Sequence, residues 1–201
     1  MPSRMRDEAT HSMPDDAVVL NPMAQVAAGI AISAPVERVW PWIVQIGSGR
    51  AGWYSYDWID NGGHPSASSI LPQHQRLEPG QVVPAIPGFT DAFIVAAVEP
   101  PTRLVLIVPD VLGGSQVRYE SLLEPLTPDR TRLTVRGVLS ERWPSRTKSG
   151  TTSAQQPFLI ERIYGLLART PRPIKLGLAY VGHHFMESRM LRGIKRRAEA
   201  S

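Results

Sequence analysis

The sequence predicts an α+β fold in which a curved antiparallel sheet wraps around a long C-terminal helix, with two short helices near the N-terminus. Residues 24–33 have the pattern of a strand, and residues 76–140 form a series of strand-like segments joined by short turns. Residues 158–200 have the composition of helices. One antiparallel sheet cannot bury its inner face alone, so we expect the last helix to cover it.

The first strand is followed by a segment, residues 34–47, whose apolar residues recur at helical spacing. Pro35 suits the first helical position and Glu37 suits the first turn. Pro41 lacks a backbone donor and its ring crowds the preceding turn. The sequence therefore leaves two alternatives: a helix kinked at Pro41, or one short turn that ends at Trp40 followed by a second.

The stretch "QIGSGRAGWYSYDWIDNGG", residues 45–63, concentrates aromatic residues between glycines. Ser55 is expected to cap a short helix that Gly62 and Gly63 end. Aromatic side chains this dense either complete a core or line a binding cavity. For three tryptophans, core packing is the favoured interpretation: Trp40, Trp42 and Trp58.

From residue 76 the chain alternates strands and turns. Two β-branched segments, "DAFIVAAVEP" and "TRLVLIVP", are followed by two alternating segments that "TPDR" joins as a hairpin. Such short links predict an antiparallel meander of about five or six strands. Residues 142–157 are expected to form a polar loop, and the last helix is expected to begin near Ile174, after a break at "TPRP".

Composition narrows the class of protein. The absence of cysteine excludes disulfides, thiolate metal sites and a cysteine nucleophile. We expect residues 1–17 to be a disordered tail and residues 18–198 to form a single domain.

Glu99, Pro100 and Arg103 interrupt the longest apolar stretch of the sequence. This stretch therefore predicts two strands and no integral membrane association. We expect a cytoplasmic protein, with no nucleic-acid partner.

The formal net charge is +4, and basic residues gather in "ESRMLRGIKRRAEAS" at the C-terminus. The favoured interpretation is a solvated helix end whose cations offset the helix dipole. The alternative is a surface that contacts anionic lipid or nucleic acid. No zinc-finger, helix-turn-helix or RNA-binding motif accompanies the cluster.

The opening motif "ISAPVERVWPWIVQIG" resembles the START / Bet v 1-like superfamily, also called SRPBCC. Within it, "WPWIVQIGSGRAGWYSYDWIDN", "LPQHQRLEPGQVV" and "MESRMLRGIKRRAE" resemble the bacterial polyketide cyclase/dehydrase-like subgroup. The resemblance covers about residues 24–198 and implies a helix-grip (Bet v 1-like) fold with an apolar pocket under the C-terminal helix. The superfamily includes lipid carriers, hormone receptors and aromatase/cyclases, so fold alone does not choose a function.

We expect the chain to bind a small hydrophobic or aromatic ligand in an internal cavity between sheet and C-terminal helix. Flat aromatic walls, adaptable methionines and a few polar groups suit such a cavity. The candidate ligand-binding residues are Arg50, Trp53, Tyr54, Tyr56, Asp57, His74, Met186 and Met190. For the two methionines, core packing against the sheet is the favoured interpretation. A structural role is favoured for Asp57 and Asp60, with Asp57 pairing with Arg50 or lying in the first helical turn.

The second hypothesis is a polyketide cyclase/dehydratase-like enzyme acting in the same cavity. Arg50 would orient a carbonyl, while Tyr56, Asp57 or His74 would move protons. No catalytic residue is assigned, and whether the chain is an enzyme stays open. The histidines lack metal-ligand spacing, and no nucleotide-binding motif occurs, so we expect neither metal nor cofactor. A homodimer is also left open.

Overall fold

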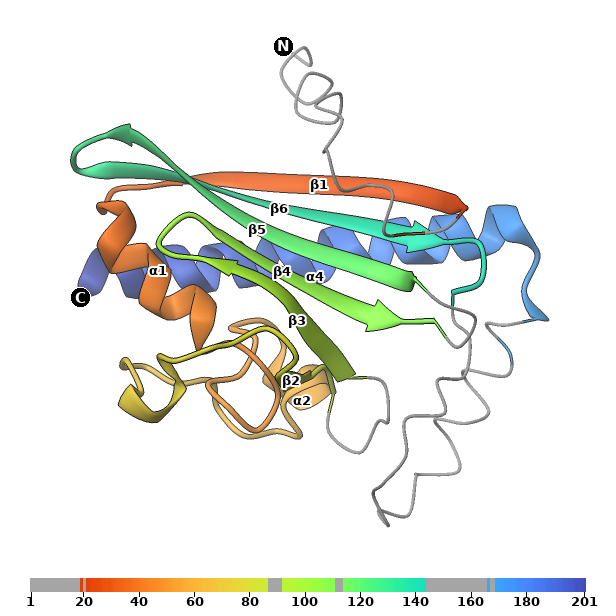
Figure 1. Cartoon of the computed structure of the whole chain (residues 1–201), viewed down its shortest axis with the longest axis horizontal. Helices are drawn as coiled ribbons and strands as arrows, with labels where there is room; N and C mark the ends of the chain where they lie inside the picture. Colours follow the sequence, from red (N-terminus) through yellow and green to blue (C-terminus); the bar gives the residue numbers. More distant parts are fainter. Residues whose placement is uncertain (1–18, 20, 87–91, 111–113, 144–165, 167–168) are drawn as a thin grey trace.

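The computed structural model describes residues 19, 21–86, 92–110, 114–143, 166 and 169–201 (Figure 1). Its elements follow the expected order of strand, two short helices, strands and long helix. They are β1 (Pro22–Ile32), α1 (Val36–Val44), α2 (Asp57–Asp60), the short 3-10 helix η2 (Pro72–His74), β2 (Val82–Pro84), β3 (Ala92–Glu99), β4 (Arg103–Pro109), β5 (Ser115–Thr127), β6 (Arg130–Ser140) and α4 (Arg172–Ala200).

Among the described residues, one six-stranded sheet has the order β1-β6-β5-β4-β3-β2, and every neighbouring pair is antiparallel. The β5–β6 hairpin turns at residues 128–129, within the predicted "TPDR". Gly137 of β6 lies opposite Val26 of β1 and opposite Tyr119 of β5. This register places a residue without a side chain between two large ones on the face that the last helix covers.

Helix α1 continues through Pro41, so the alternative of one short turn that ends at Trp40 followed by a second is wrong. Pro35 is the residue before the helix, in an extended conformation, and therefore lies one position earlier than expected. Trp42 is buried in the core, and Trp40 packs against it while partly exposed. The predicted core role of these two tryptophans is confirmed.

Helix α4 is 29 residues long and starts two residues before Ile174. It runs along the sheet, and its first turns extend past the ends of β1 and β6 (Figure 1). The C-terminal half of α4 is hydrogen-bonded to both β1 and α1. Lys195 Nζ donates to Ala31 O of β1 at 2.9 Å, and Arg38 Nη2 of α1 donates to Ala198 O at 2.9 Å. The predicted sheet wrapped on a long helix is confirmed.

Some expectations concern parts of the chain outside the described residues. These are the disordered tail 1–17, most of the polar loop 142–157 and most of the helical segment before "TPRP". The expected cap of α2 is wrong, because α2 begins after Tyr56 and its start has no side-chain cap. The Ser55 hydroxyl instead donates to Met186 O of α4 at 3.3 Å.

The predicted core role of Trp58 is wrong, since its side chain is 75% exposed on α2. Trp58 follows Asp57 on a four-residue helix whose buried residue is Asp60, so its side chain points away from the core. We therefore expect Trp58→Ser to change the free energy of unfolding by no more than about 0.5 kcal/mol. Urea unfolding of the variant would check this, and a loss several times larger would mean that the indole is packed.

Candidate functional site

A buried polar cluster lies between the sheet and the middle of α4. The Tyr119 hydroxyl of β5 donates to Glu187 Oε2 at 2.8 Å, and Met190 Sδ is 3.5 Å from the same hydroxyl. His183 Nδ1 is 3.8 Å from Glu187 Oε1, one helical turn away. Two ionisable side chains and a phenol thus meet in an interface that is otherwise formed by the hydrophobic core.

The glycine at position 137 makes room for this cluster. A Cβ at Gly137 would lie 3.5 Å from His183 Cε1 and 3.1 Å from Val26 Cγ2. The imidazole therefore lies over the bare strand backbone, in space that a side chain would otherwise fill. His183 Nε2 is buried and has no hydrogen-bond partner in the structure.

Burial dominates the electrostatics of the cluster. It raises the pKa of Glu187 to about 7, although the hydrogen bond from Tyr119 acts in the opposite direction. It lowers the pKa of His183 to about 4, helped by the neighbouring charge of His184. Burial, then the negative charge of Glu187, raises the pKa of Tyr119 well above its usual value. At neutral pH His183 is neutral, so its contact with Glu187 is not an ion pair.

Two neighbouring grooves lie between β1 and α4. The first, of about 330 Å³, is lined by residues 26–30 and by Tyr180, His183, His184, Ser188, Leu191 and Arg192. The second, of about 420 Å³, is lined by residues 23–26 and by Leu139, Leu176, Gly177 and Tyr180. Val26 and Tyr180 border both, so the grooves adjoin. His183 belongs both to the first groove and to the buried cluster.

The eight predicted ligand-binding residues do not line these two grooves. Trp53 and Tyr54 are buried in the core, where the Trp53 ring contacts Phe93 and the Tyr54 ring contacts Trp42. Tyr56 is partly exposed and stacks on Phe185 of α4 with ring centroids 4.4 Å apart. The aromatic stretch therefore supplies core and docks α4, and its part in ligand binding stays a prediction.

The two predicted methionines are one helical turn apart on α4, on the same side of the helix, but they contact different neighbours. Met190 is buried beside the Tyr119 hydroxyl and so belongs to the polar cluster. Met186 Sδ is 3.7 Å from the Ser55 hydroxyl, against the aromatic loop. Of the eight predicted residues, Met190 alone contacts the cluster through a hydrogen bond in the described part of the chain.

Arg50, Asp57 and His74 hold loops. Arg50 donates to the backbone oxygens of Val44 and Ile46, each at 3.0 Å, and to His74 O at 3.4 Å. Asp57 accepts hydrogen bonds from the backbone and hydroxyl of Ser66. The expected pairing of Arg50 with Asp57 is therefore wrong, because backbone carbonyls take the guanidinium and Ser66 takes the carboxylate.

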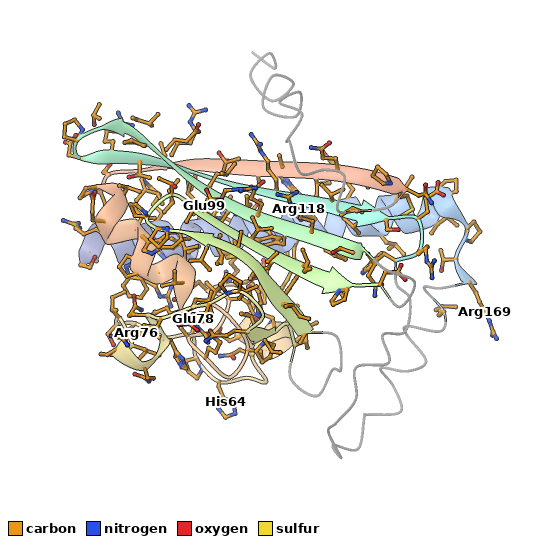
Figure 2. All side chains as sticks on the ribbon, in the orientation of Figure 1. His64, Arg76, Glu78, Glu99, Arg118 and Arg169 are labelled. Carbon is orange, nitrogen blue, oxygen red and sulfur yellow. The ribbon has the colours of Figure 1, made fainter. Side chains whose placement is uncertain are left out.

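Two further ionisable residues differ in exposure, since Asp60 is buried and His64 is exposed. Burial, then the charge of Asp57, raises the pKa of Asp60 to about 6. His64 is exposed in a loop and points away from the molecule (Figure 2). No group of His, Asp and Glu suited to a metal ion occurs in the described residues.

Sequence reasoning missed the functional potential of Glu187, Tyr119 and His183. Glu187 lies among arginines in the sequence, a pattern typical of an exposed helix face, but its side chain is buried against Tyr119. One signal was available: His183 and Glu187 are four residues apart on a helix and therefore share a face with Met190. Their partner on β5 depends on strand register, which the sequence did not give.

Comparison with solved structures gives matches to the Zhui aromatase/cyclase from Streptomyces sp. R1128, with 14% identity over 88% of this chain and 93% of that chain, at a TM-score of 0.46. CalU16 from Micromonospora echinospora matches with 18% identity over 88% and 84%, at 0.38. DynU16, of the dynemicin biosynthetic locus, matches with 18% identity over 84% of this chain at 0.43. This chain spans 46% of DynU16. No family model and no curated protein matches.

The chain has a helix-grip-like α+β fold, in which a six-stranded antiparallel sheet packs against a long C-terminal helix. The predicted arrangement of sheet and C-terminal helix is confirmed by the elements themselves, and at these identities the likeness to the solved structures extends to nothing beyond the fold. Among the described residues, no helix is both long and apolar enough to cross a bilayer.

Proposed function

We propose that this helix-grip protein binds a small hydrophobic or aromatic molecule between β1 and α4, with His183 contacting the polar group of that molecule. The observation that carries the proposal is the buried Tyr119–Glu187–His183 cluster, one member of which also lines a groove. Burying a carboxyl group costs free energy that a single hydrogen bond offsets only in part. Strongly shifted pKa values in such a setting are typical of functional sites.

The grooves supply the apolar part of this site. Strand β1 contributes small side chains between Val26 and Ile30, and Leu191 of α4 faces them. Volumes of about 330 and 420 Å³ are in the range of small-molecule sites. A neutral His183 offers one donor and one acceptor, so it suits a hydroxyl, phenol or carbonyl group on an otherwise apolar ligand.

Filling the first groove tests the proposal. Ser188 lines it on α4, and we expect Ser188→Trp to weaken binding of the neutral aromatic dye phenylnaphthylamine about tenfold, because the indole takes the volume of the ligand. Dye fluorescence in a protein titration measures the affinity. The matched control is Ser68→Trp, at an exposed loop position outside both grooves.

Equal affinity of both tryptophan variants and the wild type would show that the groove is not the site. A co-purified molecule, released by denaturation and weighed by mass spectrometry, would give the natural ligand. Loss of that molecule from the Ser188→Trp protein, but not from the Ser68→Trp protein, is the expected result.

A second candidate function is an acid–base enzyme acting on the bound molecule. The raised pKa of Glu187, about 7, favours it, because a general acid or base works best when its pKa is near the operating pH. Glu187→Gln would then keep dye binding and lose turnover of the co-purified molecule. A mass change of that molecule with wild type alone would support this function, whereas no change with either protein would leave binding as the function.

A further inference from the structure

The face of α4 that points away from the sheet carries a line of exposed apolar side chains, named here the outer stripe. Its residues are Ile174, Leu178, Val181 and Phe185, with exposed fractions of 56%, 54%, 67% and 52%. Their spacing of four, three and four residues places them on one line along the helix. Phe185 is held by its stacking on Tyr56. Soluble surfaces rarely leave several large apolar side chains together in solvent.

The same line continues into basic residues. Arg189, Arg192 and Arg196 are exposed on α4, one to three turns beyond Phe185. Arg192 Nε donates to its own helix at Ser188 O, which leaves the guanidinium on the surface. Arg169, just before α4, projects outward from the end of the molecule (Figure 2).

Acidic residues do not oppose this charge on the described part of α4. The helix contains two, Glu187 and Glu199. Glu187 is buried against the sheet. Glu199 forms an ion pair with Lys195 and accepts a hydrogen bond from the backbone N–H of Ser33. The outward face is therefore apolar in its first half and cationic in its second.

We propose that this face of α4 lies on the surface of an anionic lipid bilayer. The outer stripe would enter the region between headgroups and acyl chains, while the arginines contact lipid phosphates. From Ile174 to Arg196 the face extends about 33 Å, at roughly 1.5 Å per residue, so it would contact many lipids at once. The helix rests on the sheet and lies flat on the membrane, and no bilayer crossing is implied.

A nucleic acid fits this face less well. The phosphates of a duplex would pair with the arginines. The four apolar side chains of the outer stripe, however, cannot form hydrogen bonds with phosphates or with base edges. A second copy of the chain would cover the stripe but would offer the arginines no anionic partner from its own α4, whose two glutamates are already engaged. Charge and apolarity together therefore favour lipid, and this inference is independent of the proposed ligand site.

Vesicle flotation of the full chain tests the proposal. We expect binding to vesicles of phosphatidylcholine with phosphatidylglycerol, and little binding to phosphatidylcholine alone.

The double variant Leu178→Ser with Val181→Ser should weaken binding about tenfold, since it removes two apolar side chains that would enter the bilayer. Arg192→Gln with Arg196→Gln should weaken it about fivefold per arginine. The matched controls, Val82→Ser on exposed β2 and Arg76→Gln in an exposed loop, should bind like wild type.

A fluorescent label reports insertion directly. The chain has no cysteine, so Val181→Cys provides a single site for an environment-sensitive dye such as nitrobenzoxadiazole. We expect its emission to shift to the blue with anionic vesicles, while the dye at Val82→Cys stays unchanged.

Several results would overturn the proposal. They are no flotation with either vesicle, an equal loss in the Val82→Ser and Arg76→Gln controls, or binding to phosphatidylglycerol that the serine double variant keeps. Tighter binding to duplex DNA than to vesicles would reassign the face to nucleic acid. A wild-type dimer that Leu178→Ser with Val181→Ser converts to a monomer would reassign it to a second copy.

Discussion

Gly193→Ala is expected to destabilise the protein by about 3 kcal/mol or more, because α4 meets the aromatic loop at this glycine with no space for a methyl group. A Cβ at Gly193 would lie 2.3 Å from Tyr54 O and 2.8 Å from Tyr54 Cβ. Tyr54 cannot retreat easily. Its backbone has a φ of 58°, its hydroxyl accepts from Gln45 at 2.8 Å, and the Arg197 guanidinium lies 4.6 Å from its ring centroid.

Urea unfolding of Gly193→Ala against wild type measures the loss. The matched control is Gly182→Ala in the same helix, where an added Cβ meets nothing within 4 Å. Alanine is better than glycine inside a helix, so the control should be about 1 kcal/mol more stable than wild type. Equal stabilisation by Gly193→Ala and Gly182→Ala would mean that the backbone of Tyr54 does not pack closely against α4 at Gly193.

Glu187→Gln is expected to make the stability rise with pH between pH 4.5 and 6.5, where Glu187 and His183 offset each other in the wild type. The pKa of Glu187 is raised from 4.5 to about 7 by burial, so between these values the folded state holds a proton that the unfolded state has lost. The stability that this residue contributes is present below pH 4.5 and is lost as pH rises through 7. For a shift of this size the loss is about 3 kcal/mol.

His183 acts in the opposite direction, because burial lowers its pKa from 6.5 to about 4. Its contribution is present above pH 6.5 and is lost as pH falls through 4. In the wild type the two residues offset each other between pH 4.5 and 6.5. In Glu187→Gln only the histidine remains of the two, so stability should rise with pH across that window.

Urea unfolding of wild type and Glu187→Gln at several pH values would measure this. The informative quantity is the difference between the two proteins, in which the titration of Asp60, with a pKa raised to about 6, cancels. Above pH 7 the variant should be the more stable, since glutamine keeps an acceptor for Tyr119 without a buried charge. Parallel curves for the two proteins would mean that Glu187 titrates with an ordinary pKa.

Periodicity was a good guide where burial alternates regularly along the chain. The strands β3 to β6, the turn between the last two, and the long helix were all predicted close to their observed bounds. The exposure of the aromatic residues in 45–63 was harder to predict. Trp53 and Trp58 lie in the same aromatic stretch, yet Trp53 is buried and Trp58 is exposed. Exposure there depends on how α2 sits on the molecule, a tertiary property.

The candidate site shows the same limit. The sequence placed His183, Glu187 and Met190 on one helix, but it could not tell that Tyr119 and Gly137 face them from two other strands. It also suggested Arg50 and Asp57 as polar groups for a ligand, whereas backbone carbonyls and Ser66 occupy them. A polar side chain is available for chemistry only if no nearer partner satisfies it, and that depends on contacts distant in sequence.

By itself, then, the sequence determined the order of elements, the antiparallel sheet and the helix that covers it, because local periodicity and turn chemistry fix these. The tertiary structure alone decided which side chains share an environment. It buried Glu187 beside Tyr119, left the outer stripe of α4 in solvent, and opened the grooves beside β1. Strand register and the rotation of α4 about its axis set these features, and both arise from packing between segments far apart in the chain.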